Sequence, residues 1–117
     1  MSIYKIFHNP RCSKSRQTLK LLKENNCEIE IIYYLEIDLD VLLIKDTLEK
    51  LSLKPRDILR KSEQDYKDND LKRDSLSNDD LIDYMIKYPR LIERPIAIKG
   101  DEAVLCRPPK NIFKLIK

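Results

Sequence analysis

Apolar residues in the first third of the chain change from strand-like runs to helical spacing and back. Ile3 to Phe7 is a short β-prone run, and after Asn9-Pro10 the segment from Ser13 to Asn25 has helical periodicity. Dense β-branched and aromatic residues return from Glu28 to Tyr34, which predicts a second strand covered on both faces. This order favours a βαβ unit with parallel strands and a helix packed on the sheet.

The middle of the chain is predicted to be helical. Asp38 or Asp40 can cap a helix, and the apolar residues of that helix are Val41, Ile44, Leu48 and Leu51. From Lys61 to Asn78 the chain is mostly polar, so we expect only short helical turns at the surface. Ser77 to Asp80 resembles a capping box and predicts another helix, which ends near Tyr88-Pro89.

The last third predicts a β-hairpin and a closing helix. Two short apolar runs, at 96–98 and 103–105, flank a tight turn that contains Gly100, the only glycine. Arg107-Pro108-Pro109 then starts a helix whose apolar residues are expected to lie on the sheet: Ile112, Phe113, Leu115 and Ile116. The predicted order is β-α-β, helices, β-β-α, and we expect residues 1–117 to form one domain because no linker or repeat interrupts them.

Composition excludes several classes of function. The 23 Lys and Arg against 20 Asp and Glu leave a formal net charge of +3, so the overall charge gives little attraction to nucleic acid and any cationic site must be local. A single glycine excludes glycine-rich phosphate loops. No apolar run reaches the roughly 18 to 20 residues of a membrane span, and the N-terminus lacks the apolar region of a signal peptide. We therefore expect a cytoplasmic protein that binds neither nucleic acid nor membrane.

The three cysteines, Cys12, Cys27 and Cys106, are odd in number and widely spaced. This pattern favours a reducing compartment over a disulfide framework. Because His8 is the only histidine, a structural zinc site lacks ligands at usable spacing. Cys27 and Cys106 are expected to be inert.

Cys12 has the setting of a reactive thiolate. It lies between a predicted strand and a predicted helix, where unpaired N–H groups and the helix dipole stabilise negative charge. Basic residues and His8 surround it in sequence, and the Ser15 hydroxyl is placed to donate to the sulfur. The alternative, from these residues alone, is a small buried residue at a helix start. If Cys12 does exchange thiols, the second thiol must come from another molecule, because none lies nearby in the motif.

The segment His8-Asn9-Pro10-Arg11-Cys12-Ser13-Lys14-Ser15-Arg16, followed by Thr18-Leu19, resembles the active-site segment of the glutaredoxin-dependent arsenate reductases. Similar strings follow along the chain: Tyr34-Leu35-Glu36, Leu59-Arg60-Lys61, Leu81-Ile82, Leu91-Ile92-Glu93-Arg94-Pro95-Ile96 and Arg107-Pro108-Pro109. The resemblance implies an α/β, thioredoxin-like fold with a mixed four-stranded sheet flanked by helices.

The resemblance also implies roles for individual residues. Cys12 is the expected nucleophile, and Arg60, Arg94 and Arg107 are the expected cationic cradle for arsenate. Such a cradle is physically reasonable, because an oxyanion and a thiolate repel each other unless fixed guanidinium groups offset their charges.

Further implications concern the neighbours of the thiolate and the source of electrons. His8 and Ser15 are expected to tune the thiolate, and Pro95 is expected to be a cis proline that faces the cysteine. Arsenate is the implied substrate, glutathione the co-substrate and glutaredoxin the partner, with no bound cofactor. Many family members have Gly-Thr after the cysteine where this chain has Ser13-Lys14, and Lys14 changes the local charge.

Two alternatives keep the fold and change the function. One is a thiol oxidoreductase that removes glutathione from proteins without arsenate specificity. The other is a redox-responsive regulator that binds RNA polymerase, although such regulators usually carry a paired cysteine motif and this chain has Ser15 in its place.

Overall fold

The computed structural model describes residues 3–116, which divide into two compact units. One unit comprises the chain up to Ile37 and again from Arg94 onward, and the other comprises Asp38–Glu93. Residues 1, 2 and 117, the ends of the predicted domain, lie outside the described residues. That the two units form one domain stays a prediction.

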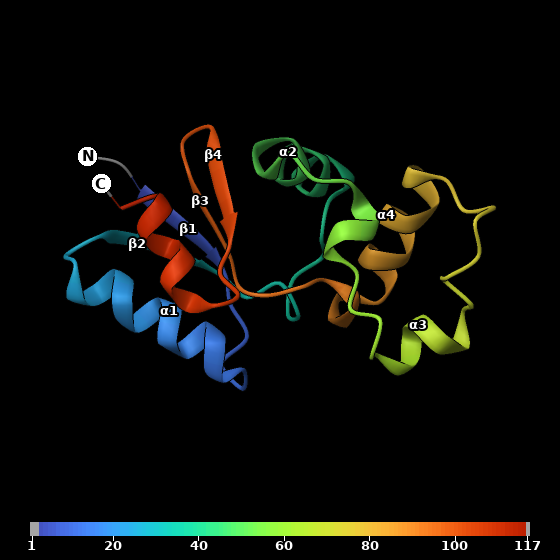
Figure 1. Cartoon of the computed structure of the whole chain (residues 1–117), viewed down its shortest axis with the longest axis horizontal. Helices are drawn as coiled ribbons and strands as arrows, with labels where there is room; N and C mark the ends of the chain where they lie inside the picture. Colours follow the sequence, from blue (N-terminus) through green and yellow to red (C-terminus); the bar gives the residue numbers. More distant parts are fainter. Residues whose placement is uncertain (1–2, 117) are drawn as a thin grey trace. The chain divides into compact units, whose positions relative to one another are not determined.

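The first unit is built on a mixed four-stranded sheet in the order β2-β1-β3-β4 (Figure 1). Strand β1 (Ile3–Phe7) pairs in parallel with β2 (Glu28–Ile32), and helix α1 (Ser13–Glu24) connects them. Strands β3 (Ile96–Lys99) and β4 (Glu102–Leu105) form an antiparallel hairpin. The predicted βαβ unit and hairpin are both confirmed, and Gly100 has the positive φ of 59° that its turn favours.

The core of this unit lies between the sheet, α1 and η3, a 3-10 helix at Pro109–Lys114. Its buried residues are Tyr4, Ile6, Leu22, Ala97, Cys106, Ile112 and Leu115. Helix α1 contributes Leu22, which is fully buried, η3 contributes Ile112, and Leu115 follows directly after η3. The core therefore fixes α1, and with it the residue that precedes α1, against the sheet.

Truncation of this core is expected to destabilise the protein. Leu22→Ala should lower the free energy of unfolding by about 2–5 kcal/mol, because it removes a fully buried side chain and leaves a cavity. Leu42→Ala is the matched control, since Leu42 is 74% exposed and its loss should cost less than about 0.5 kcal/mol. Urea unfolding of both variants measures the difference, and equal losses would contradict this description of the core.

Two details of the predicted first unit are wrong. Strand β2 is not covered on both faces: it is an edge strand that pairs only with β1, and Glu28 and Glu30 are exposed. The closing helix does not bury all four apolar residues, because Phe113 is 47% exposed. In a 3-10 helix residues three apart share a face, so Ile112 and the C-cap residue Leu115 are buried together, whereas Phe113 lies on another face.

The second unit is helical, as predicted. It consists of α2 (Val41–Leu51), η1 (Pro55–Ile58), α3 (Gln64–Asp68), α4 (Asn78–Lys87) and η2 (Pro89–Leu91). The Asp40 carboxylate caps α2 by accepting from the Leu42 N–H at 2.6 Å. The Ser77–Asp80 capping box is confirmed: the Asp80 N–H donates to Ser77 Oγ at 3.1 Å, and the Ser77 N–H donates to Asp80 Oδ2 at 2.9 Å.

The polar stretch from Lys61 to Asn78 holds one short helix, α3, and a buried anchor that the sequence did not reveal. Leu71 is fully buried although charged residues flank it. The Arg56 guanidinium secures this turn by donating to the Leu71 carbonyl at 2.8 Å and to the Arg73 carbonyl at 2.7 Å. Among residues 3–116, no helix has the length and apolar character needed to cross a membrane.

Candidate active site

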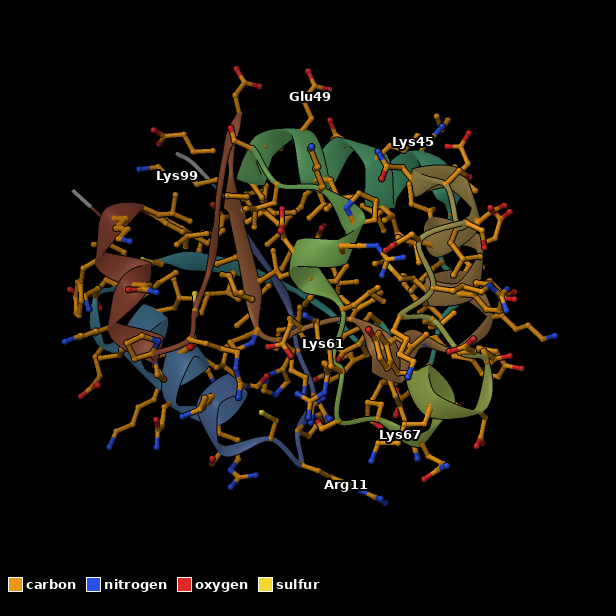
Figure 2. The ribbon with its side chains drawn as sticks, turned by 45° about the vertical axis from the view of Figure 1, so that its right-hand side comes forward. Arg11, Lys45, Glu49, Lys61, Lys67 and Lys99 are labelled. Carbon is orange, nitrogen blue, oxygen red and sulfur yellow. The ribbon has the colours of Figure 1, made fainter. Side chains whose placement is uncertain are left out.

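A hydrogen-bonded turn between β1 and α1 holds Cys12 at the start of the helix. Cys12 is the N-cap of α1, and its N–H donates to the Asn9 carbonyl at 2.9 Å. Asn9 Oδ1 accepts from the Arg11 N–H at 3.0 Å, and Arg16 Nη1 donates to the Pro10 carbonyl at 2.9 Å. The Arg16 guanidinium thus braces the turn, whereas the exposed Arg11 side chain extends away from it (Figure 2).

The Cys12 sulfur is stabilised as an anion by groups from the start of α1 and by Arg94, which precedes β3. Partial burial raises the pKa of the thiol, but hydrogen bonds from the Ser15 backbone N–H, the Arg94 side chain and the Lys14 backbone N–H outweigh it. The positive charge of Arg94 acts in the same direction, and together these groups lower the Cys12 pKa from 9.0 to about 7. About half of the protein therefore carries a thiolate at neutral pH.

The reactivity of Cys12 is expected to titrate near neutrality. With a pKa of about 7, the thiolate fraction falls to about a tenth at pH 6 and rises to about nine tenths at pH 8. The alkylation rate of a Cys27→Ser variant with iodoacetamide, measured across pH 5–10, should follow this curve. A midpoint of about 8.5 or above, the value of an ordinary thiol, would show that the sulfur is not activated.

The sheet brings Arg94 and Arg107 to one place. Phe7 at the end of β1 is opposite Ile96 at the start of β3. The residues that precede β3 therefore lie at the same end of the strands as the Cys12 turn, which follows β1. Ile96 also pairs with Leu105, and this register, continued outward by two residues, sets Arg94 opposite Arg107. Arg107 Nη1 donates to the Arg94 carbonyl at 3.0 Å. Two of the three predicted arginines therefore come together, and one of them bonds the Cys12 sulfur.

Proline residues follow both arginines. The Arg94–Pro95 peptide bond is cis. The Arg107–Pro108 bond is also cis, and this second cis bond was not predicted from the sequence. The Cys106 N–H donates to the Pro95 carbonyl at 2.9 Å, which continues the hairpin pairing beyond the ends of β3 and β4.

The two residues predicted to tune the thiolate are both buried. His8 is 5% exposed, and burial followed by the charges of Lys23 and Arg16 lowers its pKa, so the ring is neutral at pH 7. Its Nδ1 is buried and forms no hydrogen bond within residues 3–116, and the ring stands edge-on to Tyr33 with centroids 6.0 Å apart. Ser15 Oγ accepts weakly from the Asn9 N–H at 3.4 Å, and it is the backbone N–H of Ser15 that donates to the sulfur.

Arg60, the third predicted arginine, belongs to the second unit. Its N–H donates to the Leu91 carbonyl at 2.8 Å, and its guanidinium lies 3.2 Å from Glu63 Oε1 and 3.9 Å from Glu93 Oε1. Neither carboxylate was predicted from the sequence, although the three-residue spacing of Arg60 and Glu63 is a signal for such a pair. Two acidic partners hold the Arg60 side chain within its own unit, and its role toward a substrate stays a prediction.

The remaining cysteines have different surroundings. Cys106 is in the core, where burial raises the pKa of its thiol to about 12 against the opposing hydrogen bonds from Thr18 and Ala97. Cys27 is half-buried, with its Sγ 3.8 Å from the Asn25 carbonyl. No group of three or more metal-binding side chains occurs in the described part of the chain.

The chain resembles known proteins along nearly its whole length. The sequence profile of the ArsC family matches residues 7–115. The uncharacterized protein YfgD of Escherichia coli (strain K12) is 43% identical over 113 residues, which cover 96% of this chain and 95% of that protein. An arsenate reductase of Neisseria meningitidis serogroup A is 41% identical over 109 residues, which cover 92% of this chain and 93% of that protein.

Solved structures agree with the architecture. The structure of an arsenate reductase from Vibrio cholerae superposes with a TM-score of 0.93 at 38% identity, covering 97% of each chain. An ArsC-family related protein from Bacteroides fragilis, at 20% identity, shares the fold with a TM-score of 0.82. The thioredoxin-like fold with a mixed four-stranded sheet, predicted from the resemblance, is therefore confirmed.

Proposed function

Because the chain belongs to the ArsC family, we propose that it is an arsenate reductase in which the Cys12 thiolate is the nucleophile. One observation supports this most strongly: the Cys12 sulfur has a pKa of about 7 and accepts a hydrogen bond from Arg94. A thiolate and an adjacent guanidinium are the two components needed to bring an oxyanion to a sulfur.

The first step joins arsenic to Cys12. The thiolate attacks the arsenic of dihydrogen arsenate, a sulfur–arsenic bond forms, and one arsenic–oxygen bond breaks. The departing oxygen takes one proton from solvent and leaves as water, so the protein keeps a thiol ester of arsenate that carries one negative charge. Arg94 offsets the repulsion between the two anions and then stabilises the negative oxygens of the adduct.

The second step reduces arsenic. A glutathione thiol attacks the Cys12 sulfur, a disulfide between Cys12 and glutathione forms, and the sulfur–arsenic electron pair stays on arsenic. Arsenic(V) thus becomes arsenic(III), which leaves as arsenite, while the two thiol sulfurs supply the two electrons. A glutaredoxin thiolate then takes the glutathione and releases Cys12 as a thiolate. Thiols supply every electron, so the cycle needs no bound cofactor.

The remaining roles are assigned by position. Arg107, which donates to the Arg94 carbonyl, is proposed to bind substrate oxygens beside Arg94. Arg60 is proposed as the third substrate-binding arginine on the resemblance alone. Neutral His8 and buried Ser15 are proposed to tune the thiolate by excluding water from the Cys12 turn and keeping it ordered. Pro95 is proposed to fix the backbone that follows Arg94. The proposed co-substrates place the reaction in the cytoplasm.

A coupled assay tests this function. Arsenate, glutathione, glutaredoxin, glutathione reductase and NADPH should give NADPH oxidation that depends on both arsenate and this protein. Release of glutathione from a peptide mixed disulfide, measured without arsenate, tests the general thiol oxidoreductase. Activity in the second assay alone would overturn the arsenate proposal and leave the alternative.

A further inference from the structure

Tyr33 lies beside His8 at the end of the sheet from which the chain continues to Cys12. The parallel register of β1 and β2 pairs Phe7 with Ile32, and its continuation by one residue pairs His8 with Tyr33. The His8 backbone N–H donates to the Ile32 carbonyl at 3.0 Å, so the pairing does extend beyond the two strands. Paired residues of a parallel sheet have their side chains on the same face, and the two rings meet edge-on with centroids 6.0 Å apart.

The face that His8 and Tyr33 share is the one on which α1 packs. Tyr4 and Ile6 of β1 are buried in the core together with Leu22 of α1. Side chains alternate between the two faces along a strand, so His8, two residues after Ile6, continues this row. His8 is only 5% exposed, whereas Tyr33 is 40% exposed and follows β2, the edge strand of the described sheet. The Tyr33 ring therefore covers His8 on the open side of the sheet.

A covered His8 ring is stable only while it is uncharged. A protonated ring carries an N–H on both nitrogens, and the buried Nδ1 has no hydrogen-bond partner within residues 3–116. Burial and then the cations Lys23 and Arg16 of α1 lower the pKa of His8. On the side of β3, the antiparallel register sets the uncharged Pro95 opposite His8. Removal of the covering ring should admit water and raise the His8 pKa toward its ordinary value of 6.5.

His8 is also the fixed end of the Cys12 turn. The next residue, Asn9, accepts from the Cys12 N–H at 2.9 Å through its carbonyl and donates its own N–H to Ser15 Oγ at 3.4 Å. The Ser15 backbone N–H in turn donates to the Cys12 sulfur. A His8 ring that turned out into solvent would therefore move Asn9, and with it the N–H groups that are aligned on the sulfur.

We propose that Tyr33 is a positioning residue: its ring covers His8, and the covered His8 holds the Cys12 turn at the end of β2. The inference rests on the proposed role of Cys12 as the nucleophile, to which it adds a residue that acts on the sulfur through His8. The ring of Tyr33 supplies the cover and the hydroxyl group takes no part in it. Tyr33→Phe should therefore keep this role, and Tyr33→Ala should lose it.

Titration of His8 is the first readout. Because His8 is the only histidine, its Cε1 proton gives one identifiable signal in the proton NMR spectrum of the protein freed of any histidine tag. The wild-type midpoint should lie below 6.5. In Tyr33→Ala the midpoint should rise toward 6.5, because the cover is lost while the two cations of α1 remain. Tyr33→Phe should keep the wild-type midpoint.

Alkylation of Cys12 is the second readout. In a Cys27→Ser background, Tyr33→Ala should lower the rate with iodoacetamide at pH 7 by about threefold or more. The reason is that less well aligned N–H groups stabilise the thiolate less and so raise the pKa of Cys12 above about 7. Tyr33→Phe should stay within about 1.5-fold of the parent protein.

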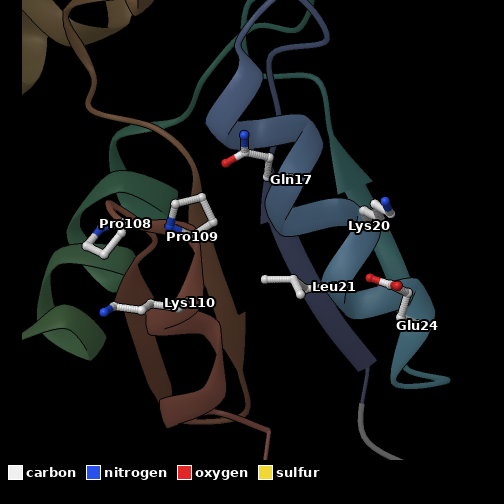
Figure 3. A pocket seen from close by; sticks show the side chains of 7 residues that line it. All are labelled: Gln17, Lys20, Leu21, Glu24, Pro108, Pro109 and Lys110. Carbon is white, nitrogen blue, oxygen red and sulfur yellow. The ribbon is translucent and has the colours of Figure 1, made fainter.

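Phe113→Ala is the matched control. Phe113 is 47% exposed, which is similar to Tyr33, and belongs to η3, which faces α1 across a groove of about 420 Å³. Figure 3 shows Gln17 and Leu21 of α1 on one side of this groove and Pro109 of η3 on the other. Loss of an exposed ring on η3 should leave both readouts at their wild-type values.

The outcomes separate this role from a merely structural one. An unchanged His8 midpoint in folded Tyr33→Ala protein, or an unchanged alkylation rate, would overturn the inference, and so would equal losses in Tyr33→Phe. If Tyr33→Ala does not fold, Tyr33→Thr replaces it, because threonine favours extended backbone but is too small to cover the ring. Both readouts are taken without arsenate, so the expected results without arsenate turnover contradict the proposed function and leave the role of Tyr33 standing.

Discussion

Cys12→Ser is expected to lower arsenate-dependent NADPH oxidation by at least about a thousandfold. The wild-type sulfur has a pKa of about 7 and is about half ionised at neutral pH, whereas a serine hydroxyl at the same helix start remains protonated. Loss of a nucleophile removes the covalent intermediate, and the remaining groups then catalyse little by themselves. Initial rates in the coupled assay, at saturating arsenate and glutathione, measure the effect.

Two cysteine variants serve as controls for this prediction. Cys27→Ser should stay within about twofold of wild type, because Cys27 has no contact in the Cys12 turn among those that the structure describes. Thermal unfolding of Cys12→Ser should match wild type, because Cys12 is only half-buried. Substantial turnover by a folded Cys12→Ser protein would contradict the assignment of the nucleophile.

Arg94→Ala is expected to lower arsenate turnover by about a hundredfold to a thousandfold, the usual effect of removing a preorganised donor from developing negative charge. The same change should raise the pKa of Cys12 above about 7, because Arg94 supplies both a hydrogen bond and a charge to the sulfur. The rate profile should therefore shift to higher pH as well as fall. Coupled assays and iodoacetamide titration across pH 5–10 measure the two effects separately.

Arg94→Lys and Arg90→Ala complete this experiment. Lysine keeps the charge of Arg94 but loses its planar set of donors, so an intermediate loss is expected. Arg90 is an exposed arginine of η2, and its loss should change neither turnover nor the Cys12 pKa measurably. If the Cys12 midpoint stays at about 7 in Arg94→Ala, then Arg94 does not stabilise the thiolate.

The sequence predicted correctly those elements whose structure is determined by a few neighbouring residues. The helix after Cys12, the capping box of Ser77 and Asp80, and the turn at Gly100 each follow from a few neighbouring residues, and each is where the sequence predicts it. Stabilisation of the thiolate by backbone N–H groups was predictable for the same reason, because the N–H groups of Lys14 and Ser15 belong to the first turn of α1.

Features that depend on distant residues were harder to predict. The apolar residues of β2 do not reveal the order of the strands, and that order places β2 at the edge of the sheet. Ile29 and Ile31 therefore suggested a fully buried strand, whereas both are only partly buried. Arg94 meets Cys12 through the pairing of β1 with β3, which lie far apart in sequence. The meeting of Arg94 and Arg107 was expected only from the family resemblance, and the register of the hairpin now explains it.

Intact-protein mass spectrometry after incubation with arsenate and glutathione, without glutaredoxin, tests whether arsenate reduction passes through a disulfide between Cys12 and glutathione. We expect one bound glutathione on Cys12, formed in step with arsenite and absent when arsenate is omitted or when Cys12 is serine. A glutathione adduct that forms equally without arsenate, or arsenite released with no adduct on Cys12, would contradict it.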